Sequence, residues 1–215
     1  MAVFGILAAR FNYPAVLDGS AETVLPQLLA TGQFGRAIWA FYALLPLVWL
    51  PAGVGAYYAL RRTSRGSMLL AMQFAFMASI SMMLGLMRWP SIHWRLAEAY
   101  QVANPDQRAV IAAVFGGLNS YLGNYVGEFL GELSFSLFFL LSAWAMKQSR
   151  AMPRWAAPLG LITGVAGLAG MFRNVTSAVA IVASVNNYLL PVWMIVFGML
   201  LLRYRNDPQL DASAR

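Results

Sequence analysis

Five stretches of this sequence are apolar for long enough to cross a lipid bilayer as helices. A transmembrane helix needs roughly 20 apolar residues, because its backbone finds no water to hydrogen-bond inside the hydrocarbon. The five stretches are Arg36–Leu60, Ser67–Met87, Tyr121–Met146, Trp155–Met171 and Ala183–Leu202. Composition agrees, since 60% of the 215 residues are hydrophobic and 11% are charged, whereas soluble domains carry roughly 25% charged residues. The sequence therefore predicts an all-α, polytopic transmembrane helical bundle.

The remaining segments complete a six-helix plan, which we expect to form a single integral membrane domain over residues 1–215. Met1–Ala9 is apolar but too short to cross, so it is either the end of a first helix or a short interfacial helix. Two polar insertions are predicted on the outer face and a polar tail on the cytoplasmic face: residues 11–35, 88–115 and 203–215 respectively.

Local signals place breaks and helix starts within this plan. Pro46 and Pro51 lie inside the first long span and are expected to kink it. Ser20 precedes a short amphipathic stretch at 21–29, and Asn104-Pro105 pairs a capping residue with proline at the first helical position. Both signals predict helices within the outer insertions.

Basic residues are distributed unevenly between the two sides of the predicted membrane. Eight lie in three segments that carry no acidic residue before Asp207: Arg61, Arg62, Arg65, Lys147, Arg150, Arg154, Arg203 and Arg205. Basic residues on the other side are offset by acidic ones. The positive-inside rule makes the first set cytoplasmic, so we expect a bacterial inner-membrane protein with a cytoplasmic C-terminus. The same rule accounts for the net charge of +7 without nucleic-acid binding.

The stretch Gly116–Ser134 combines the character of a membrane helix with an unusually polar face. At about 100° per residue, its glycines and polar residues share one side and its large apolar residues the other. Glu128 and Glu132, four residues apart, would be neighbours on an α-helix. Two ionised carboxylates so placed need compensating cations or a proton, and Arg88 and Arg173 lie at a suitable depth.

Two hypotheses follow for these charged groups. In the first, they line a polar, outward-facing cavity that binds a ligand or handles protons. Its other candidate lining residues are Asn119, Asn124 and Tyr100. In the second, Glu–Arg pairs hold the helices together.

Gly123, Gly127 and Gly131 recur every four residues, a pattern that lets helices approach closely. Packing within one chain is the preferred interpretation, and a homodimer is the alternative. The chain has no cysteine and a single histidine, His93, which we expect to be solvated at the membrane interface. No metal site or cofactor is predicted, because a metal needs several convergent ligands.

Three motifs resemble one known family. They are Asn12-Tyr13-Pro14-Ala15-Val16-Leu17 with Val24-Leu25, Arg88-Trp89 with Leu96-Ala97 and Tyr100, and Gly127-Glu128 with Leu130-Gly131-Glu132. Together they resemble the DUF4386 family of bacterial six-helix membrane proteins of unknown function. The resemblance implies the same fold over nearly the whole chain. Members of the family usually have a full first helix before the Tyr13-Pro14 loop, where this chain has only Met1–Ala9. The resemblance implies no activity.

The preferred hypothesis is a non-enzymatic protein that binds a small apolar or lipid-like molecule, with a sensing or accessory role. One alternative is a membrane-embedded enzyme that uses Glu128 or Glu132 as acid or base on an apolar substrate. Another is a small proton-coupled transporter, against which stand its size and the lack of a visible repeat. The lipid bilayer is the expected partner in each case.

Overall fold

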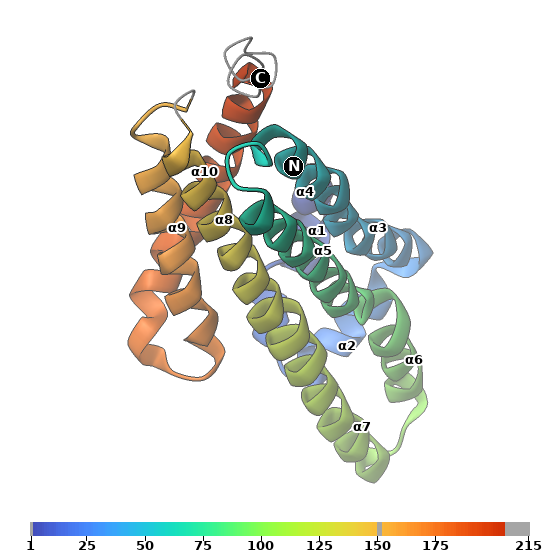
Figure 1. Ribbon diagram of the computed structural model, residues 1–215. Helices are drawn as coiled ribbons and strands as arrows, with labels where there is room; N and C mark the ends of the chain where they lie inside the picture. Colours follow the sequence, from blue (N-terminus) through green and yellow to red (C-terminus); the bar gives the residue numbers. More distant parts are fainter. Residues whose placement is uncertain (1, 150–151, 205–215) are drawn as a thin grey trace. The chain divides into compact units, whose positions relative to one another are not determined.

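The computed structural model of the protein describes residues 2–149 and 152–204, and within them all regular structure is helical (Figure 1). The α-helices are α1 (Ala2–Phe11), α2 (Ala21–Ala30), α3 (Gly32–Leu44), α4 (Trp49–Leu60), α5 (Arg65–Met87), α6 (Trp94–Val102), α7 (Pro105–Leu118), α8 (Gly131–Gln148), α9 (Ala156–Gly170) and α10 (Ala180–Tyr204). The predicted all-α class is therefore confirmed. Residues 150–151 of the second basic loop and 205–215 of the tail lie outside the described residues.

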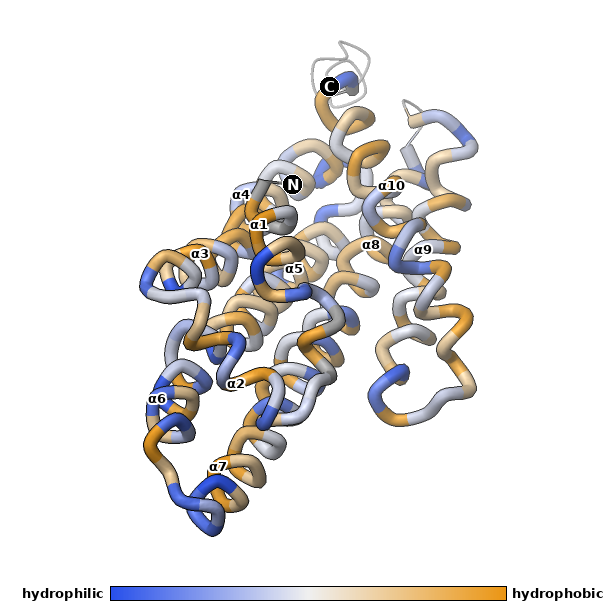
Figure 2. The backbone as a smooth tube through the Cα atoms, turned by 180° about the vertical axis from the view of Figure 1, so that it is seen from behind, coloured by the Kyte–Doolittle hydropathy of each residue, from blue (hydrophilic) through white to orange (hydrophobic). Residues whose placement is uncertain are grey.

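The predicted membrane spans are also present. Five helical stretches of the described chain are long and apolar enough to cross a bilayer: Gly32–Leu60, Arg65–Val102, Pro105–Gln148, Ala156–Asn174 and Ser177–Arg203. Hydrophobic residues recur along them, whereas hydrophilic residues gather at the turn between α6 and α7 (Figure 2). The second and third stretches are longer than expected, because most of the predicted 88–115 insertion is helical. Its first part, which includes α6, extends the stretch that begins with α5, and its last part belongs to α7, in the stretch that ends with α8.

Capping chemistry explains where α7 begins. The Asn104 side chain accepts from the Gln107 backbone at 2.9 Å, and the Gln107 side chain accepts from the Asn104 backbone at 3.0 Å. This reciprocal pair satisfies donors that a helix start otherwise leaves free, so α7 begins at the predicted Pro105. The short helix predicted after Ser20 is α2, whose apolar face is formed by Val24 and its neighbours.

Three of the long helical stretches depart from α-geometry inside their length. A 3-10 turn at Leu45–Val48 separates α3 from α4 and contains the predicted break at Pro46. A π-turn at Trp89–His93 joins α5 to α6, and a π-helix at Asn119–Leu130 joins α7 to α8. Because π-helices bond residues five apart, the 100° periodicity expected through Gly116–Ser134 does not hold across this segment.

The chain forms two compact units. The first contains the residues up to Pro46 together with Met82–Glu128, and the second contains Leu47–Ser81 and the residues from Phe129 onward. In the first unit, α2 buries Val24, Leu25 and Leu28 completely against its neighbours α3, α6 and α7. Such burial of large apolar side chains stabilises by about 1.5–3 kcal/mol each.

Aromatic and small residues hold the second unit together. Trp49 of α4 meets Phe135 of α8 edge to face, with ring centroids 4.4 Å apart. Glycines on α9 let α8 and α10 approach, and a Cβ on Gly160 would lie 2.6 Å from the ring of Trp193. Figure 1 shows α8, α9 and α10 side by side.

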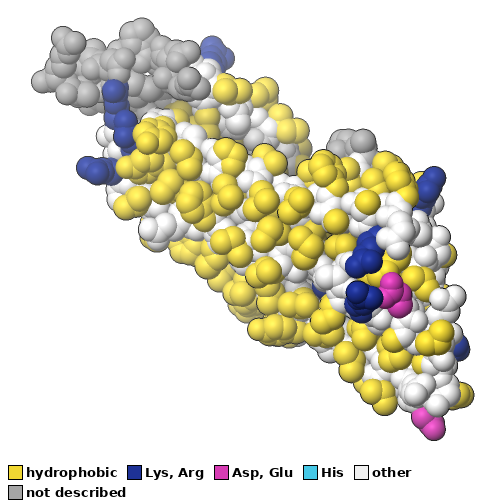
Figure 3. Space-filling view, turned by 90° about the vertical axis from the view of Figure 1, so that its right-hand side faces the viewer, with side chains coloured by type: hydrophobic (Ala, Val, Ile, Leu, Met, Phe, Trp, Pro, Cys, Tyr) yellow, Lys and Arg dark blue, Asp and Glu magenta, His cyan; other side chains and the backbone are white. Residues whose placement is uncertain are grey.

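The outward surface of several helices is apolar, as a bilayer requires. On α10, Ile181 is 80% exposed, Tyr188 80% and Leu202 72%. Hydrophobic side chains also cover most of the face in Figure 3, where charged side chains form small separate groups. On a water-exposed helix such a surface would be a large apolar patch, whereas it is typical of a membrane-spanning helix.

Candidate functional site

The polar residues singled out in the sequence are divided between the two units. Arg88, Asn119 and Glu128 belong to the first unit, whereas Glu132 and Arg173 belong to the second. Tyr100, Asn124, Gly123 and Gly127 are also in the first unit and Gly131 is in the second.

Arg88 is the buried charge of the first unit. It is 6% exposed and directly follows α5. Its Nε donates to Asn119 Oδ1 at 3.1 Å, and its Nη1 donates to the carbonyl oxygen of Gly85. Asn119 donates in turn to the carbonyl oxygen of Leu17 at 2.9 Å. The guanidinium thus joins the end of α5 to the start of the π-helix and, through Asn119, to the N-terminal segment.

Glycines make room for this arrangement. A Cβ on Gly123 would lie 2.5 Å from Nη2 and 2.7 Å from Cζ of Arg88. One turn away, a Cβ on Gly85 would lie 2.6 Å from Cα of Gly127. The helices therefore meet through backbone at Gly85 and Gly127, and the guanidinium fills the space beside Gly123.

Glu128 and Arg88 both affect the electrostatic environment of Tyr13. Tyr13 lies outside the candidate spans, and its hydroxyl is 3.2 Å from that of Tyr42. Burial raises the pKa of Tyr13 well above its ordinary value, and the neighbouring Tyr42 raises it further. The charge of Glu128 also raises this pKa, whereas the charge of Arg88 lowers it. Glu128 and Arg88 therefore both lie within electrostatic range of Tyr13.

The prediction that His93 is solvated is wrong. Its side chain is fully buried between the rings of Trp89 and Phe115, with centroids at 4.8 and 4.6 Å. Neither ring nitrogen has a hydrogen-bond partner in the described part of the chain. The polar surroundings in sequence suggested an exposed loop, but the π-turn keeps the segment helical and places His93 on the core side.

Glu132 is a carboxylate of the second unit whose side chain is 10% exposed. Its Oε2 forms an ion pair with Arg173 Nη2 at 3.0 Å, and its Oε1 accepts from Asn186 Nδ2 at 3.3 Å. Arg173 Nη1 also donates to Asn187 Oδ1 at 3.3 Å. The pair connects α8 to the 3-10 turn Met171–Asn174 and to α10.

Replacing Glu132 by glutamine is expected to lower the free energy of unfolding by about 1.5–3 kcal/mol, because Arg173 then loses its counter-charge. The double variant Glu132→Gln/Arg173→Gln should recover part of that loss. Unfolding in mixed micelles by dodecyl sulfate, followed by circular dichroism, measures both. Asp106→Asn, an exposed change, is the control. Equal losses in Glu132→Gln and Asp106→Asn would contradict a structural role for the pair.

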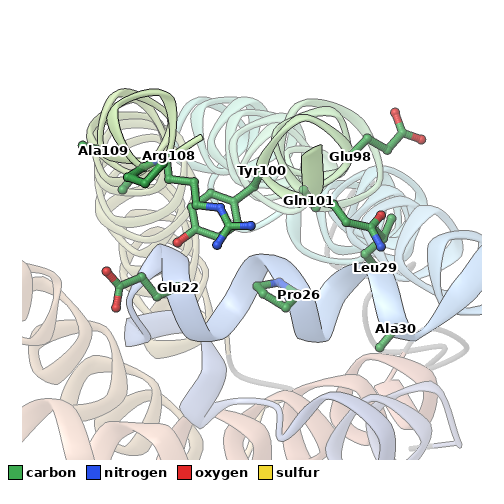
Figure 4. A pocket seen from close by; sticks show the side chains of 12 residues that line it. Glu22, Pro26, Leu29, Ala30, Glu98, Tyr100, Gln101, Arg108 and Ala109 are labelled. Carbon is green, nitrogen blue, oxygen red and sulfur yellow. The ribbon is translucent and has the colours of Figure 1, made fainter. Parts of the chain in front are cut away.

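A pocket of about 970 Å³ lies among α2, α6 and α7 of the first unit (Figure 4). Its apolar wall includes Pro26 and Leu29 of α2 and Ala97, Ala109 and Ala112 of α6 and α7. Glu22, Tyr100, Gln101 and Arg108 supply polar groups. This combination of an apolar wall with a few polar groups is typical of small-molecule sites.

Two of these polar side chains lie against each other. The guanidinium of Arg108 stacks over the ring of Tyr100, with Cζ 5.1 Å from the centroid. Figure 4 shows both reaching from α7 and α6 toward α2. The Tyr100 side chain is held in place by burial, since the residue is only 8% exposed.

The sequence predicted Tyr100 as a lining residue of a cavity with Glu128 and Glu132, which do not line this pocket. It did not indicate Glu22 or Arg108. The helix start at Asn104-Pro105 was the available signal for Arg108, because it puts residue 108 at the end of the first turn. Nothing in the sequence indicates that α2 packs beside α6 and α7. Among the described residues, no group of three or more metal-ligating side chains gathers.

Comparison with known proteins gives one match. A family model described as a domain of unknown function, DUF4386, matches residues 1–198. No curated protein and no solved structure matches the chain. The match spans both units and includes the three motifs that indicated the family from sequence. The chain therefore belongs to the DUF4386 family.

Proposed function

We propose that this multi-pass membrane protein binds a small amphipathic, lipid-like molecule in the α2–α6–α7 pocket, in a sensing or accessory role. The observation that carries the proposal is the pocket itself, about 970 Å³ in volume. Ligand pockets of small molecules have about 300–1,000 Å³ and a mainly apolar lining with few polar groups. Arg108, whose guanidinium lies over the Tyr100 ring, supplies a cationic group beside an apolar wall.

The distribution of basic residues supports an orientation for the pocket. Arg61 and Arg62 lie in the short α4–α5 connection, and Arg65 directly follows it as the first residue of α5. Arg154 lies in the α8–α9 connection, and Lys147 lies in the last turn of α8. The positive-inside rule places these connections in the cytoplasm. We accordingly propose a bacterial inner-membrane location with a cytoplasmic C-terminus, in which the pocket faces outward.

The contacts of Glu132 argue against acid–base catalysis at this residue. Both carboxylate oxygens lie beside partner groups from other elements, Arg173 and Asn186. A general acid or base has to reach a substrate proton within hydrogen-bond distance. A carboxylate surrounded in this way connects helices instead.

Filling the pocket tests the proposal. Ala109→Trp places an indole in the pocket from an exposed position on α7, whereas Ala113→Trp, one turn along the same helix, lies outside the lining. Native mass spectrometry after detergent exchange would measure retained lipid. We expect at least about fivefold less lipid on Ala109→Trp than on the parent, and no change for Ala113→Trp. Equal retention by all three proteins would refute the proposed site.

A further inference from the structure

Two side chains of opposite charge line the pocket without a charged partner of their own. Glu22 lies in the first turn of α2 and Arg108 near the start of α7, and both are exposed. In the ranges 2–149 and 152–204, no ion pair engages either of them. Arg108 contacts the Tyr100 ring, and this leaves its N–H edge available. The pocket therefore presents one carboxylate and one guanidinium.

The third charged residue of the lining is already engaged. Glu98 accepts from Trp94 Nε1 at 2.8 Å through one oxygen and pairs with Arg95 Nη1 at 3.0 Å through the other. In Figure 4 its carboxylate points away from Arg108 and Tyr100. Glu98 therefore adds no charge at the polar end of the pocket, where Glu22 and Arg108 remain.

Such a pair of unlike charges selects against singly charged ligands. An anion attracted by Arg108 is repelled by Glu22, and a cation attracted by Glu22 is repelled by Arg108. A ligand that carries both charges satisfies both residues. Arginine binds phosphate through paired N–H donors, and a carboxylate accepts charge-assisted hydrogen bonds from a primary ammonium group, which has three donors.

We infer that the pocket takes a zwitterion, a phosphate beside a primary amine, with its apolar part against Pro26 and Leu29. This inference rests on the proposed function. In the inferred complex, Arg108 and the Tyr100 hydroxyl bind the phosphate, and Glu22 binds the ammonium. A lipid head group of the phosphatidylethanolamine type has this chemistry, and so does its free, deacylated form. A trimethylammonium head group lacks N–H donors and binds Glu22 less well.

The test titrates the full-length protein in detergent with four probes and measures apparent Kd by native mass spectrometry. The probes are short-chain phosphatidylethanolamine, phosphatidylcholine and phosphatidylglycerol, and glycerophosphoethanolamine. We expect the parent to bind phosphatidylethanolamine about tenfold more tightly than the other two lipids. Tighter binding of phosphatidylethanolamine than of glycerophosphoethanolamine would show that the natural ligand is a membrane lipid. Equal binding of the two would support a zwitterionic ligand and show that it is a soluble molecule.

Two variants separate the roles of the charges. Glu22→Gln should abolish the preference for phosphatidylethanolamine and leave phosphatidylglycerol binding unchanged or stronger. Arg108→Gln should weaken all three lipids about tenfold, and the neighbouring exposed change Asp106→Asn should alter none. If the preference for phosphatidylethanolamine survives Glu22→Gln, or is missing in the parent, the zwitterion inference is wrong, although the proposed binding site is not thereby refuted. Lipid binding that Ala109→Trp leaves intact refutes the site itself.

Discussion

Replacing Arg88 by methionine is expected to lower the free energy of unfolding by about 3–5 kcal/mol, the range for removing one partner of a buried charged group. The side chain is 6% exposed and bonds both Asn119 and the Gly85 carbonyl oxygen. Methionine keeps the length of the side chain, leaves those acceptors without their donor and removes a positive charge from the neighbourhood of Glu128. Net stabilities of 5–15 kcal/mol are usual, so this loss is a large fraction.

Unfolding in mixed micelles by dodecyl sulfate measures the effect. Arg65→Met, at the exposed start of α5, is the matched control, with an expected change within about 0.5 kcal/mol. Arg88→Lys should fall between the two, because an ammonium group keeps the charge but cannot reproduce the planar donor geometry. If Arg88→Met and Arg65→Met unfold at the same detergent fraction, the cluster has no structural role.

Gly85→Ala is the second change with a large expected effect. Its Cβ would lie 2.6 Å from Cα of Gly127 and 3.0 Å from the carbonyl oxygen of Leu122. Both are backbone atoms, so the clash cannot be relieved by a rotamer change and the helices have to move apart. Overpacking costs about 1–3 kcal/mol, and we expect the upper end, with a larger loss for Gly85→Leu.

Gly55→Ala is the control for the glycine change. Gly55 is exposed in the middle of α4, and a Cβ there meets nothing within 4 Å. Alanine favours a helix over glycine by up to about 1 kcal/mol, so Gly55→Ala should be neutral or stabilising. In thermal unfolding we expect a lower melting temperature than the parent's for Gly85→Ala, and an unchanged or higher one for Gly55→Ala. A Gly85→Ala protein as stable as the parent would show that the backbone contact is unimportant.

The fold was predictable from sequence because its signals are local. Apolar length alone gives the spans, Pro46 marks the interruption of the first one, and Asn104 with Gln107 caps α7 where expected. The two π segments were not predictable, since no residue type demands them. They change the register of the polar helix and turn His93 inward, and both effects depend on packing that involves distant parts of the chain.

The candidate site was predictable only in fragments. Glu128 and Glu132 were noticed because charges are rare in a span, but their α-helical spacing did not indicate that they belong to different units. Tyr100 was recognised, yet its pocket depends on α2, which is separated from it by more than sixty residues of chain. Contacts over such separations leave no local pattern, so the sequence does not indicate that Glu22 and Arg108 line the same pocket.

The interleaving of the two units along the chain affects how the protein is made. Synthesis proceeds from the N-terminus, and compact units fold as they emerge. The first unit is complete once Glu128 has been added, whereas α4 and most of α5 have to wait for α8, α9 and α10. Until then, Trp49 lacks its partner Phe135. The nascent helix pair α4–α5 therefore needs lipid or an insertion factor to shield it until the last three helices arrive.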